Sequence, residues 1–567
     1  MTSDESNRRP HLSAVSLLDS LANSDAGAQR ALTAIYGPDA GVISERLTLI
    51  RRVLTTHAQR YGDEPVRLFR CPGRINLRGM HVDTHGGYLN LATHQREVVV
   101  SMAENSDGRV TFANIAPEFD EASFPVPAAP FSSQASGNWM TYITSPEVEA
   151  EVGARRGDWS NYVRGAVIRV AHHLPQVSMQ GFHGVVGSDI PSGAALSSSA
   201  ALCLALVAAT LARHEKSVSP EELIALAQDA EWYTGSRCGR GDQAAEVLGA
   251  RDSVVNLTLA PHAGGINSAR YARIPDTARV LVINSFTKRS ISGPQLVDYT
   301  RNRFAYSIAM EIARQETVRF GIPMERADHL RSLADFSSDS LSDIGGAKFL
   351  YALLRRIPEE IELDALRSRY ELPNLDATYR QCFGNVSEQD RPHAFDVRGP
   401  LLFGIAESER ARAFFEHLQE GDVVTCGTLM SVGHDGDRRF THAGTPYRYD
   451  VSDSALAQLE QSRTPIELCP GSYRASTPAL DALVDVALDA GALGASLTGA
   501  GIAGVVLALC LQEDCDAIAS RLRVFLGSQA YATLRGVNNP PTSLELAQGI
   551  VLNHATSAVG ELDLASV

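Results

Sequence analysis

The segment that most constrains this chain of 567 residues covers positions 182–215, FHGVVGSDIPSGAALSSSAALCLALVAATLARHE. Its pattern predicts a strand, a loop of small residues and a helix that is apolar on nearly every side. Such a helix is buried in a folded protein, because none of its faces is suited to water. The fold must therefore surround this helix, with the small-residue loop at the helix N-terminus.

Composition excludes several classes of protein. The chain is long enough for more than one folded unit, since single cores rarely grow beyond about 250–300 residues. A net charge of −15 argues against a surface for nucleic acid. The longest apolar run, at about 200–212, is shorter than the ~20 residues that a bilayer requires, so we expect no association with a membrane.

The cysteines and the N-terminus indicate a cellular compartment. Eight cysteines are scattered along the chain without a CxxC pair, which argues against zinc or redox centres built on cysteine. The opening residues, MTSDESNRRPHLS, lack the apolar segment of a signal peptide. We therefore expect a cytoplasmic protein with free thiols.

Strands and helices alternate in both halves of the chain, which predicts an α+β protein of two lobes. Helices are expected at 161–173 and after Ser219, which combines an N-cap, a proline and a glutamate at N3. VRLFRCPGR predicts a strand that leads into a glycine turn. We expect a helical extension at 1–65, a first domain at 66–286, a second domain at 287–555 and a loose tail at 556–567.

The small-residue loop, Pro191 to Ala200, is suited to an anion. Small side chains allow backbone N–H groups to approach a ligand closely, and the helix that follows presents the positive end of its dipole. This combination favours a phosphate, and the three consecutive serines are possible ligands of Mg²⁺. The same pattern also fits an ordinary helix cap with a small-residue packing surface.

Two glycine-containing segments have weaker signals. Leu497 to Gly504 reads LTGAGIAG and suits either a nucleotide site or a tight turn between lobes. In CGRGDQ the carboxylate of Asp242 is flanked by glycine, so it is open to a ligand. It could accept a proton from a substrate hydroxyl in a phosphoryl transfer, or simply cap the helix that follows.

The segment RINLRGMHVDTHGG, residues 74–87, carries a third set of polar side chains. Arg74 could stabilise negative charge on a transferring phosphoryl group. His81 and Asp83 could bind sugar hydroxyls, since their side chains offer both donors and acceptors. In a turn, however, these two residues also commonly form local hydrogen bonds.

Taken in order, these segments resemble the GHMP kinase superfamily and, within it, galactokinase and related sugar-1-kinases. CPGRINLRGMHVDTHGG is similar to the galactokinase signature PGRVNLIGEHTDYNGG, and PSGAALSSSAAL to the phosphate loop PxGAGLSSSAAL. SLTGAGIAGVVLAL resembles the third family motif, and CGRGDQ resembles CGIMDQ. The resemblance spans about 30–530 and implies a two-lobed GHMP kinase fold with the active site in the cleft between the lobes.

The resemblance also implies an activity and a role for each residue. The activity is ATP-dependent phosphorylation of the anomeric hydroxyl of a sugar. Asp242 would be the base, Arg74 would orient the reacting groups, and Ser198 would bind Mg²⁺. The sugar would contact Met80, His81, Asp83, Gly239 and Tyr299. The ATP phosphates would lie against Gly193, Ala194, Ala195, Leu196, Ser197, Ser198, Ser199, Gly499 and Gly501.

Several residues depart from the family pattern, and Met80 is the most informative of them. Thr84 replaces Tyr, Ala195 replaces Gly, and Arg240 replaces an apolar residue. In galactokinases the residue at the place of Met80 is Glu, which is understood to bind the sugar's C6 hydroxyl. Methionine accepts hydrogen bonds only weakly, and an unpaired buried polar group costs about 1–3 kcal/mol.

Met80 therefore predicts altered recognition at C6. A pentose, a 6-deoxy sugar and a uronic acid are the sugars that fit, and Arg78 and Arg240 are candidates for pairing with a uronic acid carboxylate. An alternative is a galactokinase-like regulator that binds sugar and ATP with weak or no turnover, although intact Arg74, Ser198 and Asp242 favour the enzyme. A GHMP kinase for a non-sugar alcohol such as mevalonate fits the signature around His81 less well.

Overall fold

The computed structural model describes residues 11–23, 25–127, 138–287, 294–384 and 386–564. It confirms the predicted α+β class. An eight-stranded sheet has the order β14-β1-β2-β5-β3-β4, with β6 paired to β2 and β7 to β6. Its strands are β1 (Arg67–Arg78), β2 (Tyr88–Glu104), β3 (Arg109–Asn114), β4 (Ala122–Pro125), β5 (Phe182–Ser188), β6 (Val254–Thr258), β7 (Arg270–Ala272) and β14 (Gly560–Glu561).

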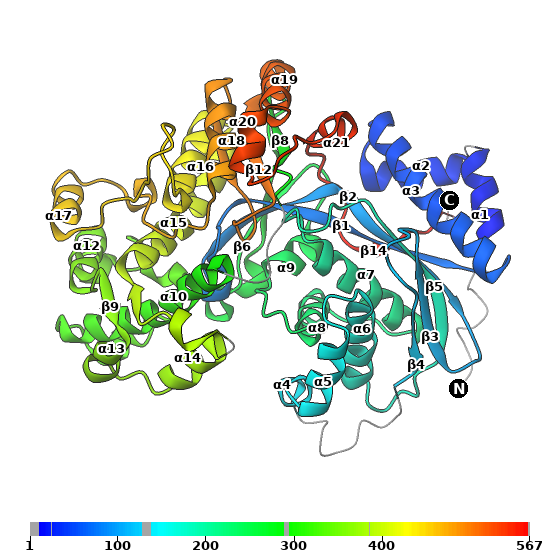
Figure 1. Ribbon diagram of the computed structural model, residues 1–567, viewed down its shortest axis with the longest axis horizontal. Coiled ribbons are helices and arrows are strands. Elements are labelled where there is room, and N and C mark those ends of the chain that lie inside the picture. The colour runs from blue at the N-terminus through cyan, green and yellow to red at the C-terminus, as the bar shows by residue number, and fades with distance from the viewer. Residues whose placement is uncertain (1–10, 24, 128–137, 288–293, 385, 565–567) are drawn as a thin grey trace.

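Three N-terminal helices cover one face of this sheet. They are α1 (Ala14–Ala22), α2 (Ala26–Tyr36) and α3 (Ala40–Tyr61). Side chains of Ser13, Asp25 and Asp39 cap the three N-termini. Their apolar faces form one core with residues of the sheet such as Val99 and Val185. In Figure 1 these helices are the blue elements at one end of the molecule.

The opposite face of the sheet is covered by helices that include the apolar one. They are α6 (Ser160–His173), α7 (Ser198–Arg213), α8 (Pro220–Tyr233) and α9 (Gly241–Leu248), and α4 (Trp139–Ile143) and α5 (Pro146–Ala154) pack outside α6 and α8. Helix α7 is buried against the sheet together with α6 and α8, as its composition predicts. The capping box expected at Ser219 is present, with Glu222 at N3.

The second domain contains a four-stranded sheet with the order β11-β12-β8-β13 and most of the remaining helices. Its strands are β8 (Ala278–Asn284), β11 (Gly494–Leu497), β12 (Val505–Leu511) and β13 (Ile550–Leu552), and β9 (Glu360–Glu362) pairs with β10 (Ala394–Asp396). Its helices are α10 (Pro294–Arg319), α11 (Met324–Ala327), α12 (Gly346–Arg356), α13 (Leu363–Arg369), α14 (Leu375–Phe383), α15 (Arg398–Glu420), α16 (Val423–Asp437), α17 (Asp453–Gln461), α18 (Pro478–Asp489), α19 (Cys515–Leu526), α20 (Gln529–Leu534) and α21 (Ser543–Gln548).

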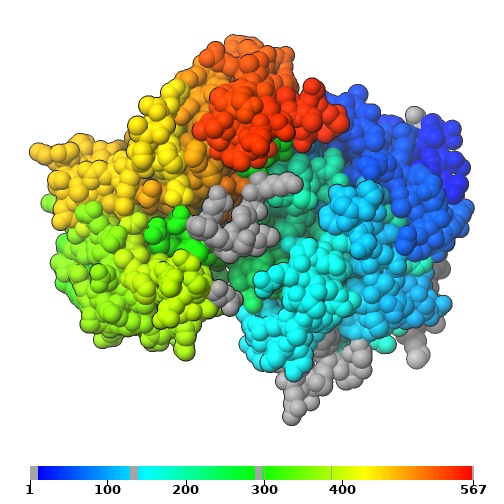
Figure 2. Space-filling model, in the orientation of Figure 1, coloured from blue at the N-terminus to red at the C-terminus, as the bar shows by residue number. Residues whose placement is uncertain are grey.

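The two halves of the molecule are evident in Figure 2. The green and yellow surface of the second domain lies on one side, the cyan and blue surface of the first on the other, and the red C-terminal helices between them at the top. Strands β1 and β2 run from the N-terminal helices to the centre of the molecule (Figure 1). The Arg96 side chain on β2 donates to the carbonyl of Gln548 in α21, which joins the two halves there.

Three sequence expectations are corrected by the strand pairing. The predicted glycine turn after VRLFRCPGR is absent, because β1 continues through Gly73 with only a bulge against β2. The strand placed at the end of the first domain, β8, pairs with β12 and β13 of the second sheet, so the change of sheet precedes it. The tail is not loose up to position 564, since β14 pairs with β1 and Leu562 and Leu564 are buried.

Two further observations concern the cysteine thiols and the search for a membrane-spanning helix. All eight cysteines are unpaired, as expected for free thiols. Among the helices that the structure describes, none combines the length and the apolar character needed to cross a bilayer.

A buried ionic cluster between the N-terminal helices and the sheet yields a stability prediction. The Glu97 carboxylate is fully buried, pairs with Arg70 and accepts a 2.8 Å hydrogen bond from the Tyr36 hydroxyl. Glu97→Gln leaves the buried guanidinium of Arg70 without its counter-charge, so we expect a loss of about 3–5 kcal/mol in the free energy of unfolding. Urea denaturation measures this loss.

The matched control is Glu104→Gln, which removes an exposed partner of Arg213. An exposed pair of this kind contributes at most about 1 kcal/mol. Equal stability losses in the two variants would contradict a structural role for the Glu97 cluster.

Candidate active site

Arg74 on β1 holds the carboxylate of Asp242, which lies in the first turn of α9. The Arg74 Nε and Nη2 atoms donate to Asp242 Oδ1 over 2.9 and 2.6 Å. None of the described residues donates to Oδ2. The Arg74 side chain is 6% exposed and that of Asp242 is 37% exposed. The carboxylate is thus fixed through one oxygen, and the other is free to bind a ligand.

Arg74 also contacts the small-residue loop. Its Nη1 donates to the carbonyl of Ala195 over 2.6 Å, and its backbone N–H donates to the carbonyl of Leu196 over 3.2 Å. A Cβ at Gly73 would lie only 2.8 Å from that Leu196 oxygen, so glycine is required for this approach. Strand β1 therefore packs directly against the loop.

The loop has the backbone geometry of an anion site. Gly193, Ala195 and Ser197 have φ angles of 72°, 59° and 63°. Alternation of left-handed residues with others turns backbone N–H groups toward one side, forming a concavity for an anion. Helix α7 begins at Ser198, and the Ser197 side chain does not cap it. Its first N–H groups are therefore open to a ligand at the positive end of the helix dipole.

The third glycine segment packs against this loop. A Cβ at Gly499 or Gly504 would lie 2.8 or 2.6 Å from the Cβ of Ala195, and both glycines have positive φ. Gly501 instead lies against the Ala475 carbonyl, where a Cβ would be 2.5 Å from the oxygen. Two of the three glycines thus allow two loops from different domains to meet.

Asp83 lies against the glycines of CGRGDQ. It opens a 3-10 turn, Asp83–His85, and its Oδ2 accepts a 3.3 Å hydrogen bond from the N–H of Gly241. A Cβ at Gly239 would lie 1.7 Å from the same oxygen, so that position must be glycine. Burial and the nearby charge of Asp242 raise the pKa of the Asp83 carboxyl above its ordinary value.

His81 is enclosed by groups of the second domain. Its ring stacks on Tyr473 with centroids 4.2 Å apart, and its Nε2 lies 3.3 Å from Asp437 Oδ1. Its backbone has a positive φ of 61°, which non-glycine residues adopt at an energetic cost. The side chain is 5% exposed, so little of it faces solvent.

Met80 is buried in a core that both domains share and offers no strong hydrogen-bonding atom to a ligand. Its backbone N–H and that of Gly79 donate to Glu407 Oε1 over 3.0 and 2.8 Å. The other oxygen of Glu407 binds Arg410 at 2.7 Å and lies 3.4 Å from Arg78. Helix α15 therefore sets the position of this segment through Glu407, a residue that the motifs do not reveal.

Of the two arginines that the sequence suggested as partners of a sugar carboxylate, Arg78 is occupied by other groups, whereas Arg240 is exposed with one neutral partner and stays a candidate. Arg78 is fully buried and is engaged by Glu407 and by the carbonyls of Leu429 and Met430. Arg240 donates to Gln228 over 2.8 Å. Tyr299 lies in α10, and its side chain lies outside the described part of the structure.

Glu231, at the end of α8, is the main site residue that sequence reasoning missed. Its Oε1 accepts a 2.7 Å hydrogen bond from the Ser199 hydroxyl, and its Oε2 accepts a 2.9 Å hydrogen bond from the Gln243 amide. Burial raises the pKa of this carboxyl, and the charge of Asp242 adds to the effect. In the sequence it resembles any helical glutamate, so only its burial identifies it.

The serines and these carboxylates form a set of oxygen donors. Ser198, Ser199, Glu231 and Asp242 come from the starts of α7 and α9 and the end of α8. Mg²⁺ prefers oxygen ligands and binds through one or two carboxylates together with substrate phosphates. The donor chemistry therefore fits Mg²⁺ beside the phosphate loop.

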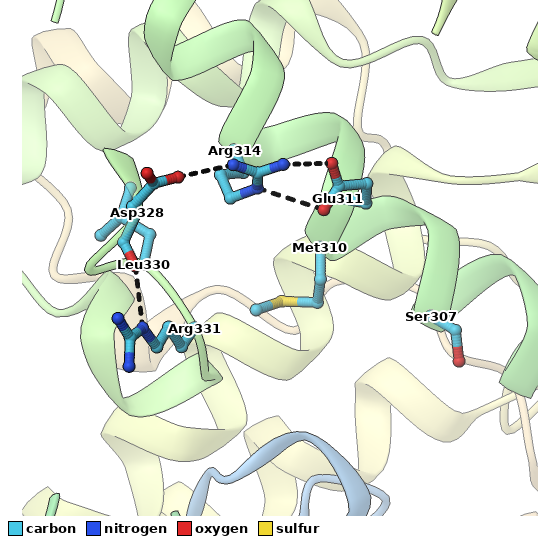
Figure 3. Close-up of a pocket in the computed structure, with 7 residues that line it drawn as sticks. All are labelled: Ser307, Met310, Glu311, Arg314, Asp328, Leu330 and Arg331. Atoms are coloured by element: carbon cyan, nitrogen blue, oxygen red, sulfur yellow. Dashed lines mark hydrogen bonds and ion pairs between the residues drawn. The ribbon is translucent and has the colours of Figure 1, made fainter. Parts of the chain in front are cut away.

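A hollow on the second domain lies apart from these residues. It is lined by Ser307, Met310, Glu311, Arg314, Asp328, Leu330 and Arg331, as Figure 3 shows. Arg314 pairs with Glu311 at 2.6 Å and with Asp328 at 2.7 Å. All of its lining residues belong to the second domain, so this hollow is separate from the residues around Asp242.

Comparison with known proteins agrees with this geometry. The profile described as GHMP kinases N terminal domain matches residues 161–250, and GHMP kinases C terminal matches residues 453–526. The chain thus carries both domains that characterise the GHMP kinase superfamily. A third profile, galactokinase galactose-binding signature, matches residues 55–104. Within the superfamily it is a galactokinase-like sugar kinase, and GHMP kinases use ATP.

Individual relatives support the same assignment. A galactokinase of Roseiflexus sp. (strain RS-1) is 25% identical over 84% of this chain and 90% of its own length. One of Chloroflexus aurantiacus is 26% identical over 82% of this chain and 89% of its own length. The structure of Lactococcus lactis galactokinase complexed with galactose covers 89% of this chain and 98% of its own, with 19% identity and a TM-score of 0.56, which establishes the shared fold.

The contact between the two loops leads to a prediction about ATP. Gly504→Ala places a methyl group within 2.6 Å of the Ala195 side chain and must displace the phosphate loop. We expect the KM for ATP to rise about tenfold or more, because a displacement of that size costs more than 1.4 kcal/mol of binding. Steady-state kinetics with varied ATP measures the effect.

Gly491→Ala is the matched control. Gly491 has a similar φ of 105°, but a Cβ there has no atom within 4 Å, so the variant carries the backbone strain alone. An unchanged KM for ATP in Gly504→Ala, or equal increases in both variants, would contradict the role of the loop contact.

Proposed function

We propose that this chain transfers the γ-phosphoryl group of ATP to the anomeric hydroxyl of a galactose-like monosaccharide with altered recognition at C6. The observation that carries the proposal is the Arg74–Asp242 pair, which lies against both the phosphate loop and Asp83. One fixed carboxylate thus lies between a site for phosphate and a site for hydroxyl groups.

In this proposal Asp242 acts as the base. Its Oδ2 accepts the proton of the C1 hydroxyl as the sugar oxygen bonds to the γ-phosphorus and the bond from that phosphorus to the β,γ-bridging oxygen breaks. The products are a sugar 1-phosphate, ADP and a proton held at first on Asp242. Arg74 orients the carboxylate through Oδ1. Such transfers depend on positioning and electrostatics rather than on a covalent intermediate.

The phosphates of ATP are proposed to lie in the loop Gly193 to Ser199, beside Gly499. Backbone N–H groups of the loop and the first turn of α7 would bind their oxygens. Ser198 and Glu231 would hold Mg²⁺, with Ser199 orienting the Glu231 carboxylate. When bound, the metal ion supplies neutralisation of phosphate charge.

The sugar is proposed to lie against Asp83, His81 and Gly239. The Asp83 carboxylate offers acceptors for hydroxyl groups, and Gly239 has no side chain that would displace it. Met80 contributes no acceptor for a C6 hydroxyl. A pentose, a 6-deoxy sugar and a uronic acid are the sugars that this surface suits.

Arg303 on α10 favours the uronic acid among these. Burial lowers the pKa of His85 to about 4 and the positive charge of Arg303 adds to this effect, whereas at Asp83, whose pKa is raised, the same charge opposes the rise. Arg303 lies one helical turn before Ser307, whose hydroxyl contacts His85 of the signature segment at 3.3 Å, and it forms no ion pair with the described residues. Of the three sugars, only a uronic acid carries a carboxylate that could pair with it.

Replacement of the proposed base tests the reaction. Asp242→Asn cannot accept a proton, so we expect turnover to fall by about 10²–10⁴-fold, while ATP binding stays close to that of the wild type. Coupled release of ADP measures turnover, and calorimetry measures binding.

Asp229→Asn serves as the control, because Asp229 pairs with Arg169 on the same domain, away from Asp242. Turnover of the Asp242→Asn variant at the wild-type rate would remove Asp242 from the base role. ATP binding without turnover of any sugar by the wild type would instead establish a regulator.

A sugar panel tests the specificity. We expect galacturonate to be a better substrate than galactose, arabinose or fucose. Arg303→Gln should lower kcat/KM for galacturonate by about 10- to 100-fold, because it removes a hydrogen bond between charged groups. The kcat/KM for arabinose should change little. Arg301→Gln, on the same helix, is the control. A preference for galactose, or equal losses for both sugars, would contradict the role of Arg303.

A further inference from the structure

Three side chains with metal-ligand chemistry meet on the face of the first sheet opposite α7. His57 comes from α3, Glu64 from the segment between α3 and β1, and His183 from β5. One ligand atom of each lies within 4.8 Å of the others. Helix α3 packs across β5 and β2 at this place, as Figure 1 shows. This cluster belongs to none of the kinase motifs.

The distances within the cluster suit a small cation. His57 Nε2 lies 3.2 Å from Glu64 Oε1, and His183 Nε2 contacts the same oxygen. Nitrogen and oxygen ligands at about 2.0–2.1 Å from a tetrahedral zinc ion are about 3.3 Å apart. The ligand atoms therefore need little movement to surround such an ion.

The two rings are already oriented. The Nδ1 atom of His57 lies 2.8 Å from the Ser101 hydroxyl, which turns Nε2 toward Glu64. The ring of His183 stacks on Tyr61 with centroids 4.2 Å apart. Outer contacts of this kind fix the ring of a metal-bound histidine.

Burial distinguishes the cluster from a surface ion pair. The His57 side chain is fully buried, while His183 and Glu64 are 14% and 27% exposed. Three protein ligands are thus largely shielded, and the partly exposed side admits a fourth ligand such as water. Two imidazoles and one carboxylate form a ligand set that suits zinc and similar divalent transition metals better than Mg²⁺.

We propose that His57, Glu64 and His183 bind a divalent transition metal of the zinc class, and that this ion fastens the N-terminal helices to the first sheet. The ion joins two segments that are distant in the sequence, 57–64 and the strand that carries His183. A ligand that binds only the folded state stabilises it in proportion to the logarithm of its concentration. The role is structural, because the cluster lies across the sheet from Asp242.

Zinc binding to the full-length protein tests the proposal. After removal of metals with a chelator, we expect one Zn²⁺ to bind with an affinity that depends on all three residues, and Zn²⁺ to raise the Tm. His183→Gln and Glu64→Gln should each weaken binding about tenfold or more and abolish the rise in Tm. Competition with a chromophoric chelator measures affinity, and Co²⁺ substitution reports the coordination by absorbance.

His262→Gln is the matched control, because His262 of the first domain pairs with Asp335 of the second at 2.9 Å and no third metal ligand joins them among the described residues. It should bind Zn²⁺ as the wild type does. Should His57→Gln fail to fold, the two variants of partly exposed residues still decide the question. No Zn²⁺ binding by the wild type, or equal binding by wild type, His183→Gln and Glu64→Gln, would overturn the proposal.

Discussion

Arg74 donates both to Asp242 and to the carbonyl of Ala195, so a single guanidinium sets the position of α9 relative to the phosphate loop. A buried guanidinium requires such partners, because an unpaired charge away from water is costly. Its planar fork also fixes the directions in which the partners lie. The approach of β1 to the loop at Gly73, and the packing of Gly504 on Ala195, preserve this arrangement from two sides.

Glu407 has the corresponding role between the two domains. Burial alone would raise the pKa of its carboxyl, but the charges of Arg78 and Arg410 outweigh burial and lower it. The ionised carboxylate accepts the backbone N–H groups of Gly79 and Met80 and so attaches the signature segment to α15. The signature segment of the first domain is consequently held in position by a helix of the second.

Local features of the sequence were predicted well where short-range physics decides them. The capping box at Ser219 and the buried helix α7 are present as expected. The predicted domain boundary at 286 does not match the strand pairing, because β8 joins the second sheet. An apolar strand such as β8 does not reveal which sheet it joins when its partner β12 lies more than 200 positions later. The prediction of a loose tail was wrong for the same reason. Leu562 and Leu564 form too short a pattern to reveal the distant core in which they are buried.

The sequence by itself determined the chemistry available to this protein: a phosphate loop at a helix N-terminus, an arginine and an aspartate in separate glycine-rich segments, and a methionine in the sugar signature. Only the tertiary structure decided which of these side chains meet. Arg74 and Asp242 are 168 positions apart, and Glu231 gains its place through burial beside Ser199. Residue type and spacing act over a few positions, whereas such contacts depend on how whole helices and strands pack.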